Sequence, residues 1–411
     1  MSFIEGTPER YQPNKTLLIR EHRPPAPFGI NGSYRDSPRP VVDWDSLPRY
    51  ISRVEVALAY PPMENETQPT SYTTPAHERT LTITGSKTRR HKDATGRDRG
   101  GAHVLTCFLD GDPTVEYVAK IYDAADYPLG FGAWDCITRA DKDYSIEACA
   151  YQSLQPIPGV GGVLVPAYFG SWTFALDVNS PDVNPDEDPE PDHPKPEPRR
   201  RWVRMILLEL VAGECLVDMM EKAEVSSPTP ERRYATTTDY SQLPPEDFRL
   251  LVMRNIIETD ITIWWEGLLT HNDIEPRNII VRPNGKVVII DFNVAQLFNF
   301  TYYGDDHPRQ LGPDDPYALT QPESPIMRYW PIPFGGAYTG WESSMWKHWV
   351  PKAWIEDLNR STEWLVKTYR DDTRYAPLRQ NWLNIGSYAH LDPRAVRLLE
   401  SLGRKPAEEG K

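Results

Sequence analysis

The chain of 411 residues is long enough for one large two-lobed domain or for two to three ordinary domains. Its hydrophobic content of 39% supports a substantial core, and its formal net charge of −14 argues against a broad nucleic-acid-binding surface. Residues 181–198 carry seven acidic residues against one lysine, so a local basic site elsewhere, including one for tRNA, stays open.

The N-terminal sequence, the apolar stretches and the cysteine spacing together indicate a reducing cellular compartment. The start, MSFIEGTPERYQPNK, lacks the basic residues and apolar run of a secretory signal, and no apolar stretch approaches the ~20 residues of a membrane span. The four cysteines are widely spaced without a C-x-x-C pair, so we expect free, buried thiols. We therefore expect a cytoplasmic protein with no membrane partner, while a nuclear location stays open. The cysteines are Cys107, Cys136, Cys149 and Cys215.

The first 75 residues are rich in proline and polar side chains, which predicts an extended arm. Within it, residues 53–60 (RVEVALAY) alternate apolar and polar positions, as in a short strand. From residue 79 the chain changes to β-branched and aromatic runs separated by glycine, aspartate and basic clusters. These runs predict antiparallel strands over residues 79–86, 102–111 and 114–124.

Helical spacing then appears over residues 143–155, followed by strand-like runs over 162–172 and 201–213. Between those two runs, residues 177–198 form an acidic, proline-rich insertion that we expect to be disordered. Residues 248–270 have the longest apolar periodicity and predict a helix. Strands therefore come first and helices later, an order that predicts an α+β fold.

The stretch from His271 to Asn293 carries the strongest chemical pattern. Two apolar runs flank Asn284-Gly285, a pair typical of tight hairpin turns. A hairpin brings its open ends together, so Asn278 and Asp291 should converge, with Asp273 close by. An amide beside a carboxylate suits Mg²⁺, and a further carboxylate can orient or deprotonate a hydroxyl. The alternative is a hairpin with polar ends and no chemistry.

The same stretch resembles the catalytic core of the protein kinase family, including fungal-type kinase-like proteins and small-molecule kinases. That family has H-R-D-x-x-x-x-N and D-F-G, where this chain has HNDIEPRN (271–278) and DFN (291–293). The resemblance implies that Asp273 is the catalytic base and that Asn278 and Asp291 bind Mg²⁺. It also implies that His271 supports the loop.

Further motifs of the family can be matched upstream in the family's order. The run EYVAKIYD resembles the V-A-I-K strand, which implies that Lys120 holds the α- and β-phosphates of ATP and that Glu147 pairs with Lys120. The run ILLELVAGE resembles the hinge, which implies that the backbone of Glu209, Leu210 and Val211 faces adenine. Seen alone, the lysine would be a solvated strand end and the glutamate an exposed helix residue.

Taken together, the resemblance implies a two-lobed, kinase-like α+β fold. An antiparallel-sheet N-lobe with one helix would span residues 76–212, and a mainly helical C-lobe would span 213–405 with the catalytic hairpin at 271–293. The implied cofactors are ATP and Mg²⁺, and the implied acceptor is a small molecule or an atypical protein.

Several positions depart from the family pattern. No G-x-G-x-x-G is present, and residues 83–103 form a longer, basic, glycine-containing segment that either covers phosphates or is a surface loop. Glu275 stands where protein kinases often carry lysine, and it would repel a triphosphate unless a metal or Arg277 neutralises it. Asn293 replaces the glycine of D-F-G. We group Glu275 with Asp273, Lys120 and Glu147 as a candidate catalytic residue.

Three functions remain open from the sequence. The first is a Mg²⁺- and ATP-dependent phosphotransferase, and the second is a pseudokinase that binds or scaffolds. The third is a kinase-like fold with another activated donor, such as aminoacyl-tRNA, in specialised metabolism. The aromatic-rich residues 328–354 predict core packing or, alternatively, a small-molecule pocket.

Overall fold

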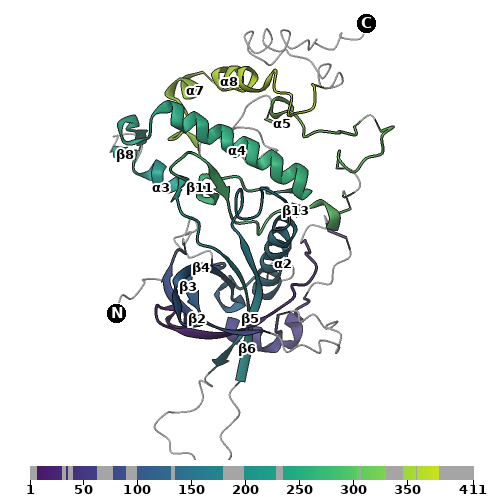
Figure 1. Ribbon diagram of the computed structural model, residues 1–411. Coiled ribbons are helices and arrows are strands. Elements are labelled where there is room, and N and C mark those ends of the chain that lie inside the picture. The colour runs from purple at the N-terminus through teal and green to yellow at the C-terminus, as the bar shows by residue number, and fades with distance from the viewer. Residues whose placement is uncertain are drawn as a thin grey trace, which may run out of the picture. The chain divides into compact units, whose positions relative to one another are not determined.

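In the computed structural model the chain forms two compact units (Figure 1). The barrel unit comprises Met1–Pro156, Pro166–Leu210 and Phe300–Tyr302; the helix unit comprises Ile157–Val165, Val211–Asn299 and Tyr303–Lys411. The residues that the structure describes are 7–29, 34–35, 40–62, 77–88, 100–130, 135–178, 199–227, 235–302, 304, 307–315, 317–329, 346–357 and 359–378.

Six antiparallel strands of the barrel unit close into a barrel in the order β1-β2-β3-β4-β6-β5. Their inward side chains form one apolar core because alternate residues of a strand point to the same face. In β2, for example, Leu81 and Ile83 are fully buried, and Leu105 and Cys107 repeat the pattern in β3. The strands are β1 (Thr16–Glu21), β2 (Glu78–Ser86), β3 (His103–Leu109), β4 (Asp112–Tyr122), β5 (Tyr168–Val178) and β6 (Arg199–Glu209).

The first part of the chain is more structured than the extended arm that its composition predicts. Strand β1 pairs with β2 along its length and with β5 through Arg20 and Glu21, so it completes the barrel. Its short alternating run buries Leu17 and Ile19, which supplies the apolar face that a barrel strand needs. The expectation of an arm over residues 1–75 is therefore wrong for this segment.

The expected strand at residues 53–60 is also wrong, because helix α1 (Arg53–Ala59) forms there. The Ser52 hydroxyl accepts a hydrogen bond from the Glu55 N–H at 3.2 Å and caps the helix. Val56 and Ala57 pack in a second apolar cluster with residues of helix α2 (Cys136–Leu154). Capping and packing thus override the alternating pattern, which is too short to decide between strand and helix.

Helix α2 confirms the helix expected over 143–155 and begins earlier, where Asp135 accepts from the Thr138 N–H at 2.7 Å. Strand β5 begins at Tyr168 rather than at residue 162 and continues through Val178, two residues into the expected acidic insertion. The rest of that insertion, residues 179–198, lies outside the described residues. Short 3₁₀ helices in this unit are η1 (Glu9–Tyr11), η2 (Trp44–Ser46) and η3 (Ala124–Asp126).

The helix unit is built on α4 (Glu246–Gly267), which confirms the helix expected over residues 248–270. Val252, Ile256 and Ile263 are among its fully buried apolar residues. Leu268 ends the helix in the left-handed conformation, with φ of +50°. Figure 1 shows α7 and α8 beside α4 in this unit. The other helices are α3 (Leu216–Glu221), α5 (Pro325–Tyr329), α7 (Lys352–Glu356) and α8 (Asn359–Tyr369), with the 3₁₀ helices η5 (Tyr240–Gln242), η6 (Pro276–Asn278) and η7 (Phe298–Phe300).

Short antiparallel pairs complete the helix unit, and β11 lies between β12 and β7. Tyr329, Trp346 and Trp349 are buried, which confirms core packing for these members of the aromatic region. Residues 330–345 of that region lie outside the described residues. The strands are β7 (Glu214–Cys215), β8 (Glu224–Ser227), β9 (Ala235–Thr238), β10 (Leu269–Thr270), β11 (Ile279–Val281), β12 (Val287–Ile289) and β13 (Gln296–Leu297).

The fold is thus a mixed α and β arrangement with an antiparallel sheet and helices, as the sequence predicts. All four cysteines are free thiols, with Cys107 and Cys136 buried and Cys149 and Cys215 half-buried. Within the described part of the chain, no helix combines the length and apolar character that a membrane span requires.

Candidate functional site

The barrel unit brings Lys120 and Glu147 together, as the sequence predicts. Lys120 lies near the end of β4 and Glu147 in the middle of α2, and the Lys120 Nζ lies 2.5 Å from the Glu147 Oε2. The side chain of Lys120 is 9% exposed and that of Glu147 is fully buried. Burial of two opposite charges is tolerated only when they are paired, so each side chain stabilises the other in place.

Tyr122, two residues beyond Lys120, also reaches this carboxylate. Its hydroxyl donates to the same Glu147 Oε2 at 2.7 Å. The ring of Tyr122 packs edge-on against Tyr144 of α2, with centroids 5.5 Å apart, and the Tyr144 hydroxyl lies 2.7 Å from the Nδ1 of His22. Burial and the nearby Arg204 lower the pKa of His22 to about 3, so this imidazole is neutral near pH 7.

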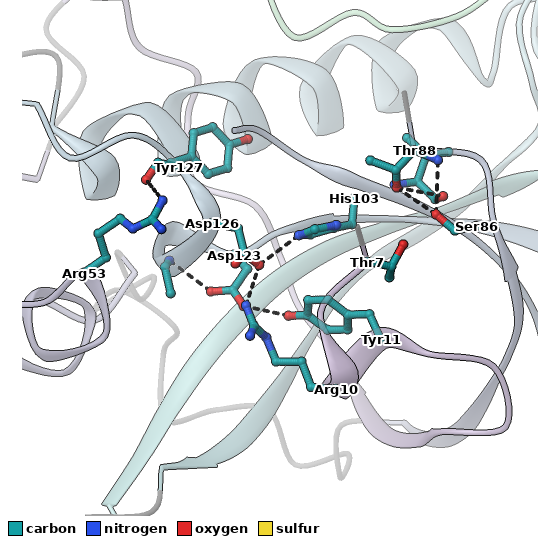
Figure 2. A network of polar contacts seen from close by, with 12 residues as sticks. Thr7, Arg10, Tyr11, Arg53, Ser86, Thr88, His103, Asp123, Asp126 and Tyr127 are labelled. Carbon is teal, nitrogen blue, oxygen red and sulfur yellow. Dashed lines mark hydrogen bonds and ion pairs between the residues drawn. The ribbon is translucent and has the colours of Figure 1, made fainter. Parts of the chain in front are cut away.

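The chain just after β4 is held by a second buried ion cluster (Figure 2). The fully buried Asp123 accepts a hydrogen bond from the Tyr11 hydroxyl at 2.7 Å (Figure 2). It also accepts one from the Nη2 of Arg201 at 2.8 Å. Arg10 bridges Asp123 and Asp126 at 3.0 and 2.5 Å. Burial opposes the charge of Asp123, but the contacts with Arg201 and Arg10 outweigh it and lower the pKa to about 2.

Figure 2 also shows His103, whose Nε2 lies 2.8 Å from the Asp126 Oδ2. Asp126 therefore links the start of β3 to Arg10 of the first segment. The sequence does not reveal this network, because Arg10, Asp123 and Arg201 are too far apart in the chain to form a local motif. Their effect is to fix the backbone three residues beyond Lys120.

The expected hinge residues lie where β6 ends. The carboxylate of Glu209 accepts from the Ala167 N–H at 3.0 Å, and its own N–H donates to the Ala167 carbonyl at 2.9 Å. The division between the two compact units falls between Leu210 and Val211. Leu210 is half-buried and Val211 is buried. The expected adenine contact of this backbone stays a prediction.

In the helix unit, the loop before β11 gathers the other expected residues. His271 is fully buried, and its Nε2 lies 2.9 Å from the Ile290 carbonyl while its Nδ1 accepts from the Asp273 N–H at 3.2 Å. Burial lowers the pKa of His271 below its ordinary value although nearby carboxylates oppose this. The imidazole thus ties the loop to the end of β12, a supporting position like the one implied by the resemblance.

Asn278 lies against Asp273 within the same loop. Its Nδ2 donates to the Asp273 carbonyl at 2.9 Å and to the Asp273 Oδ2 at 2.8 Å. The hairpin joins Ile279–Val281 to Val287–Ile289, and the Ile290 N–H donates to the Asn278 carbonyl at 2.9 Å. Gly285 takes φ of +77° in the turn, and a Cβ there would lie 2.9 Å from Leu251, so this position needs glycine.

Arg277 compensates the acidic residues of this loop. Its Nη2 lies 3.0 Å from the Asp273 Oδ2 and 3.1 Å from Oδ1, and its Nη1 pairs with Glu275. Arg277 therefore offsets the charge of Glu275, as expected if the loop is to accept an anionic ligand. The three side chains are 16 to 34% exposed, so the ion contacts are in reach of solvent.

Backbone strain is concentrated around these loop residues. Of the five non-glycine residues with positive φ in the described part of the chain, three lie between residues 268 and 291: Leu268, Asn272 and Asp291. Asp291 has φ of +71°, a conformation that L-residues other than asparagine and aspartate rarely adopt. Strain of this kind persists where the surrounding structure imposes it and is enriched at functional sites.

Asn278 and Asp291 carry oxygens of the kind that coordinate a hard cation. The Nδ2 of Asn278 is used twice on Asp273, so the amide oxygen is the atom that could coordinate, together with the carboxylate of Asp291. No cluster of three or more histidine, cysteine or acidic residues suited to a metal occurs among the described residues. Mg²⁺ commonly needs only one or two carboxylates because phosphates and waters complete its shell.

The basic segment between β2 and β3 is described only at its ends. Thr88 is held by hydrogen bonds between its hydroxyl and the backbone of Val104, at 2.9 and 3.2 Å. Residues 89–99, which include Arg89 and Arg90, lie outside the described residues. A phosphate-binding role of this segment therefore stays a prediction.

No protein-family model matches the chain, and no curated protein matches it. Among solved structures, it is similar to the ROP18 kinase domain in complex with AMP-PNP and sucrose, with a TM-score of 0.32 and 13% sequence identity. The matched part covers 55% of this chain and 54% of that one, so the chain spans about half the length of that structure. A likeness of this extent assigns neither a family nor an activity.

Proposed function

We propose that the chain is a Mg²⁺- and ATP-dependent phosphotransferase with a two-lobed, kinase-like fold, acting on a small molecule or an atypical protein. The observation that carries this proposal is the buried ion pair of Lys120 and Glu147, a strand lysine matched with a helix glutamate at 2.5 Å. Ala119 and Ile121 of β4 belong to the apolar barrel core, so the lysine between them faces away from that core and toward α2. A charge buried at this position needs charged partners, and the phosphate oxygens of a nucleotide would be a second partner for it beside Glu147.

The loop residues supply the second support. Asp273 lies in a solvent-accessible position, oriented by Asn278 and by its own N–H bond to His271. In the proposed reaction, Asp273 accepts the proton of the acceptor hydroxyl, whose oxygen takes the γ-phosphoryl group of ATP while ADP leaves. The oxygens of Asn278 and Asp291 would hold Mg²⁺, which would offset the negative charge on the phosphates. Arg277 offsets Glu275, which reduces the repulsion between this loop and an anionic ligand.

Calorimetric titration of the protein with ATP, with and without Mg²⁺, tests this proposal. We expect Mg²⁺-dependent binding that is lost in Lys120→Ala and in Asp291→Ala. Lys286→Ala, which removes an exposed lysine of the hairpin turn, is the matched control and should bind as the unaltered protein does. Failure of ATP to bind the unaltered protein at millimolar concentration would exclude a phosphotransferase of this kind.

A second candidate, a nucleotide-binding scaffold without phosphoryl transfer, is favoured by one contact. The Nη2 of Arg277 reaches both oxygens of Asp273, which competes with proton acceptance by that carboxylate. Such a protein would bind Mg²⁺-ATP in the titration above but release no ADP over many hours. ADP release that Asp273→Asn abolishes would instead establish the enzyme.

A further inference from the structure

Glu147 shares one oxygen between two donors of strand β4. The Lys120 Nζ lies 2.5 Å from its Oε2, and the Tyr122 hydroxyl lies 2.7 Å from the same atom. All three side chains are buried, with Glu147 at 0% exposure and Tyr122 at 2%. The Nζ of Lys120 also lies 5.9 Å from the centroid of the Tyr122 ring, so ring, cation and carboxylate form one compact group.

The strand geometry explains why both donors reach the same carboxylate. Residues two apart in a strand point to the same face, so Lys120 and Tyr122 both face α2. Tyr122 is held there from the helix side as well, because its ring packs against Tyr144, three residues before Glu147. Tyr144 is fixed in turn by its contact with His22.

We propose that Tyr122 is a positioning residue that keeps the carboxylate of Glu147 hydrogen-bonded when Lys120 turns its charge toward an anionic ligand. This inference rests on the proposed nucleotide-binding function and adds a member to that site. The physical reason lies in the burial of Glu147. A fully buried carboxylate that loses a donor is strongly destabilised, so a lysine that must serve both a carboxylate and a phosphate needs a substitute donor.

The Tyr122 hydroxyl also helps Lys120 keep its orientation toward a ligand. Hydrogen bonds to a buried charge are stronger than those between neutral groups, and they reinforce one another in a low-dielectric interior. With Tyr122 in place, the carboxylate keeps a hydrogen bond while Lys120 shares its charge with phosphate oxygens. Without the hydroxyl, each contact of Lys120 with a ligand would weaken the hydrogen bonding of Glu147 more strongly.

A double-substitution cycle of Tyr122→Phe and Glu147→Gln, read on the dissociation constant of Mg²⁺-ATP, tests this role. We expect Tyr122→Phe to weaken binding about 10-fold, as the loss of a hydrogen bond to a charged group implies. In the Glu147→Gln background, the same change should weaken binding less than about 2-fold, because the charged acceptor is gone. A packing role would instead give equal effects in both backgrounds and would overturn the proposal.

Tyr127→Phe is the matched control. Its hydroxyl also donates to a carboxylate of α2, Asp143, at 3.3 Å, and Tyr127 belongs to the separate apolar cluster of α1 and the start of α2. We expect no change in the affinity for Mg²⁺-ATP from this substitution. An equal loss in Tyr127→Phe and Tyr122→Phe would show a general effect of removing hydroxyls near α2 and would overturn the role of Tyr122.

Urea unfolding of the same four proteins needs no ligand. It distinguishes failure of the proposed function from failure of the proposed role of Tyr122. We expect Tyr122→Phe to change the unfolding equilibrium constant in the protein with Glu147. The change should be several-fold smaller in the Glu147→Gln protein, because the two residues are coupled. Additive effects on unfolding overturn the contact itself. If no variant and no unaltered protein binds ATP, the proposed function fails and the role of Tyr122 in ligand binding fails with it. Binding with additive effects on affinity overturns the role of Tyr122 alone.

Discussion

Two carboxylates of the molecule, Glu147 and Asp273, are held in opposite ways. Glu147 is fully buried in the barrel unit, and its partner Lys120 is 27 residues away in the chain. Asp273 is 18% exposed in the helix unit, and its partners Arg277 and Asn278 are four and five residues away. The first depends on the packing of a whole unit, and the second on the conformation of one short loop. Changes at Glu147 should therefore act on stability, and changes at Asp273 on chemistry.

The largest expected effect is on turnover, from Asp273→Asn. Loss of a positioned base lowers rates by about 10²–10⁴-fold. The substitution keeps the shape of the side chain, so the free energy of unfolding should change by less than about 1 kcal/mol. ADP release from Mg²⁺-ATP measures the loss of turnover, and urea unfolding measures the change in the free energy of unfolding. Turnover that survives this substitution would show that Asp273 is not the base.

Lys120→Met should produce the opposite result, a large loss of stability. The substitution leaves a buried carboxylate without its cation, and breaking a buried pair in this way typically costs about 3–5 kcal/mol. Urea unfolding measures the loss, with the exposed Lys286→Met as the control. A loss below about 1 kcal/mol would mean that Glu147 finds other support, and the contrast with Asp273 would then disappear.

The histidines extend the comparison to pH. Burial lowers the pKa of His307 in the helix unit to about 4, against about 6.5 for a free histidine. Its folded-state pKa is depressed, so its neutral form stabilises the fold above pH ~6.5 and that stability is lost as the pH falls toward about 4. We expect a slope of about 1.4 kcal/mol per pH unit from this residue.

Acid titration of unfolding free energies checks the role of His307. His307→Phe keeps an aromatic ring among Trp264, Trp265 and Phe298 and removes the titrating group. The substituted protein should lose less stability than the unaltered one between pH 6.5 and 4.5. Parallel curves for the two proteins would assign the acid sensitivity to other groups, such as His22 in the barrel unit.

The smallest effect is expected from Arg277→Ala. The side chain is 34% exposed, and ion pairs in reach of solvent contribute about 0–1 kcal/mol. Its contribution should also fall as NaCl is raised from low concentration to about 0.5 M, whereas the Lys120–Glu147 pair should be insensitive. A salt-independent loss above about 2 kcal/mol would show that the Arg277 contacts behave as buried ones.

The sequence predicts those parts of the structure that local patterns decide. Apolar periodicity gives α2 and α4, and Asn284-Gly285 gives the hairpin, because each depends on neighbours within a few turns or residues. The pair of Lys120 and Glu147 was matched by order along the chain and lies together in the structure.

Other features depend on contacts between distant segments, so no local pattern reveals them. Arg201 and Asp123 are 78 residues apart, and Tyr11 and Asp123 are 112 apart. Tyr122 could have been found by its position two residues after Lys120, since both must face the same side of β4. The sequence does not indicate strand β1, because its alternation covers only six residues of a proline-rich segment and its partner strands are distant in the chain.

Strand β1 has a practical consequence for anyone who shortens this chain. It lies between β2 and β5, so its removal would leave two long strands with unpaired backbone N–H and C=O groups. Such edges recruit strands from other molecules. The sequence pattern alone would place the start of the folded part near residue 77. A shortened protein that begins there should therefore aggregate, whereas one that retains residues 7–29 should stay dispersed.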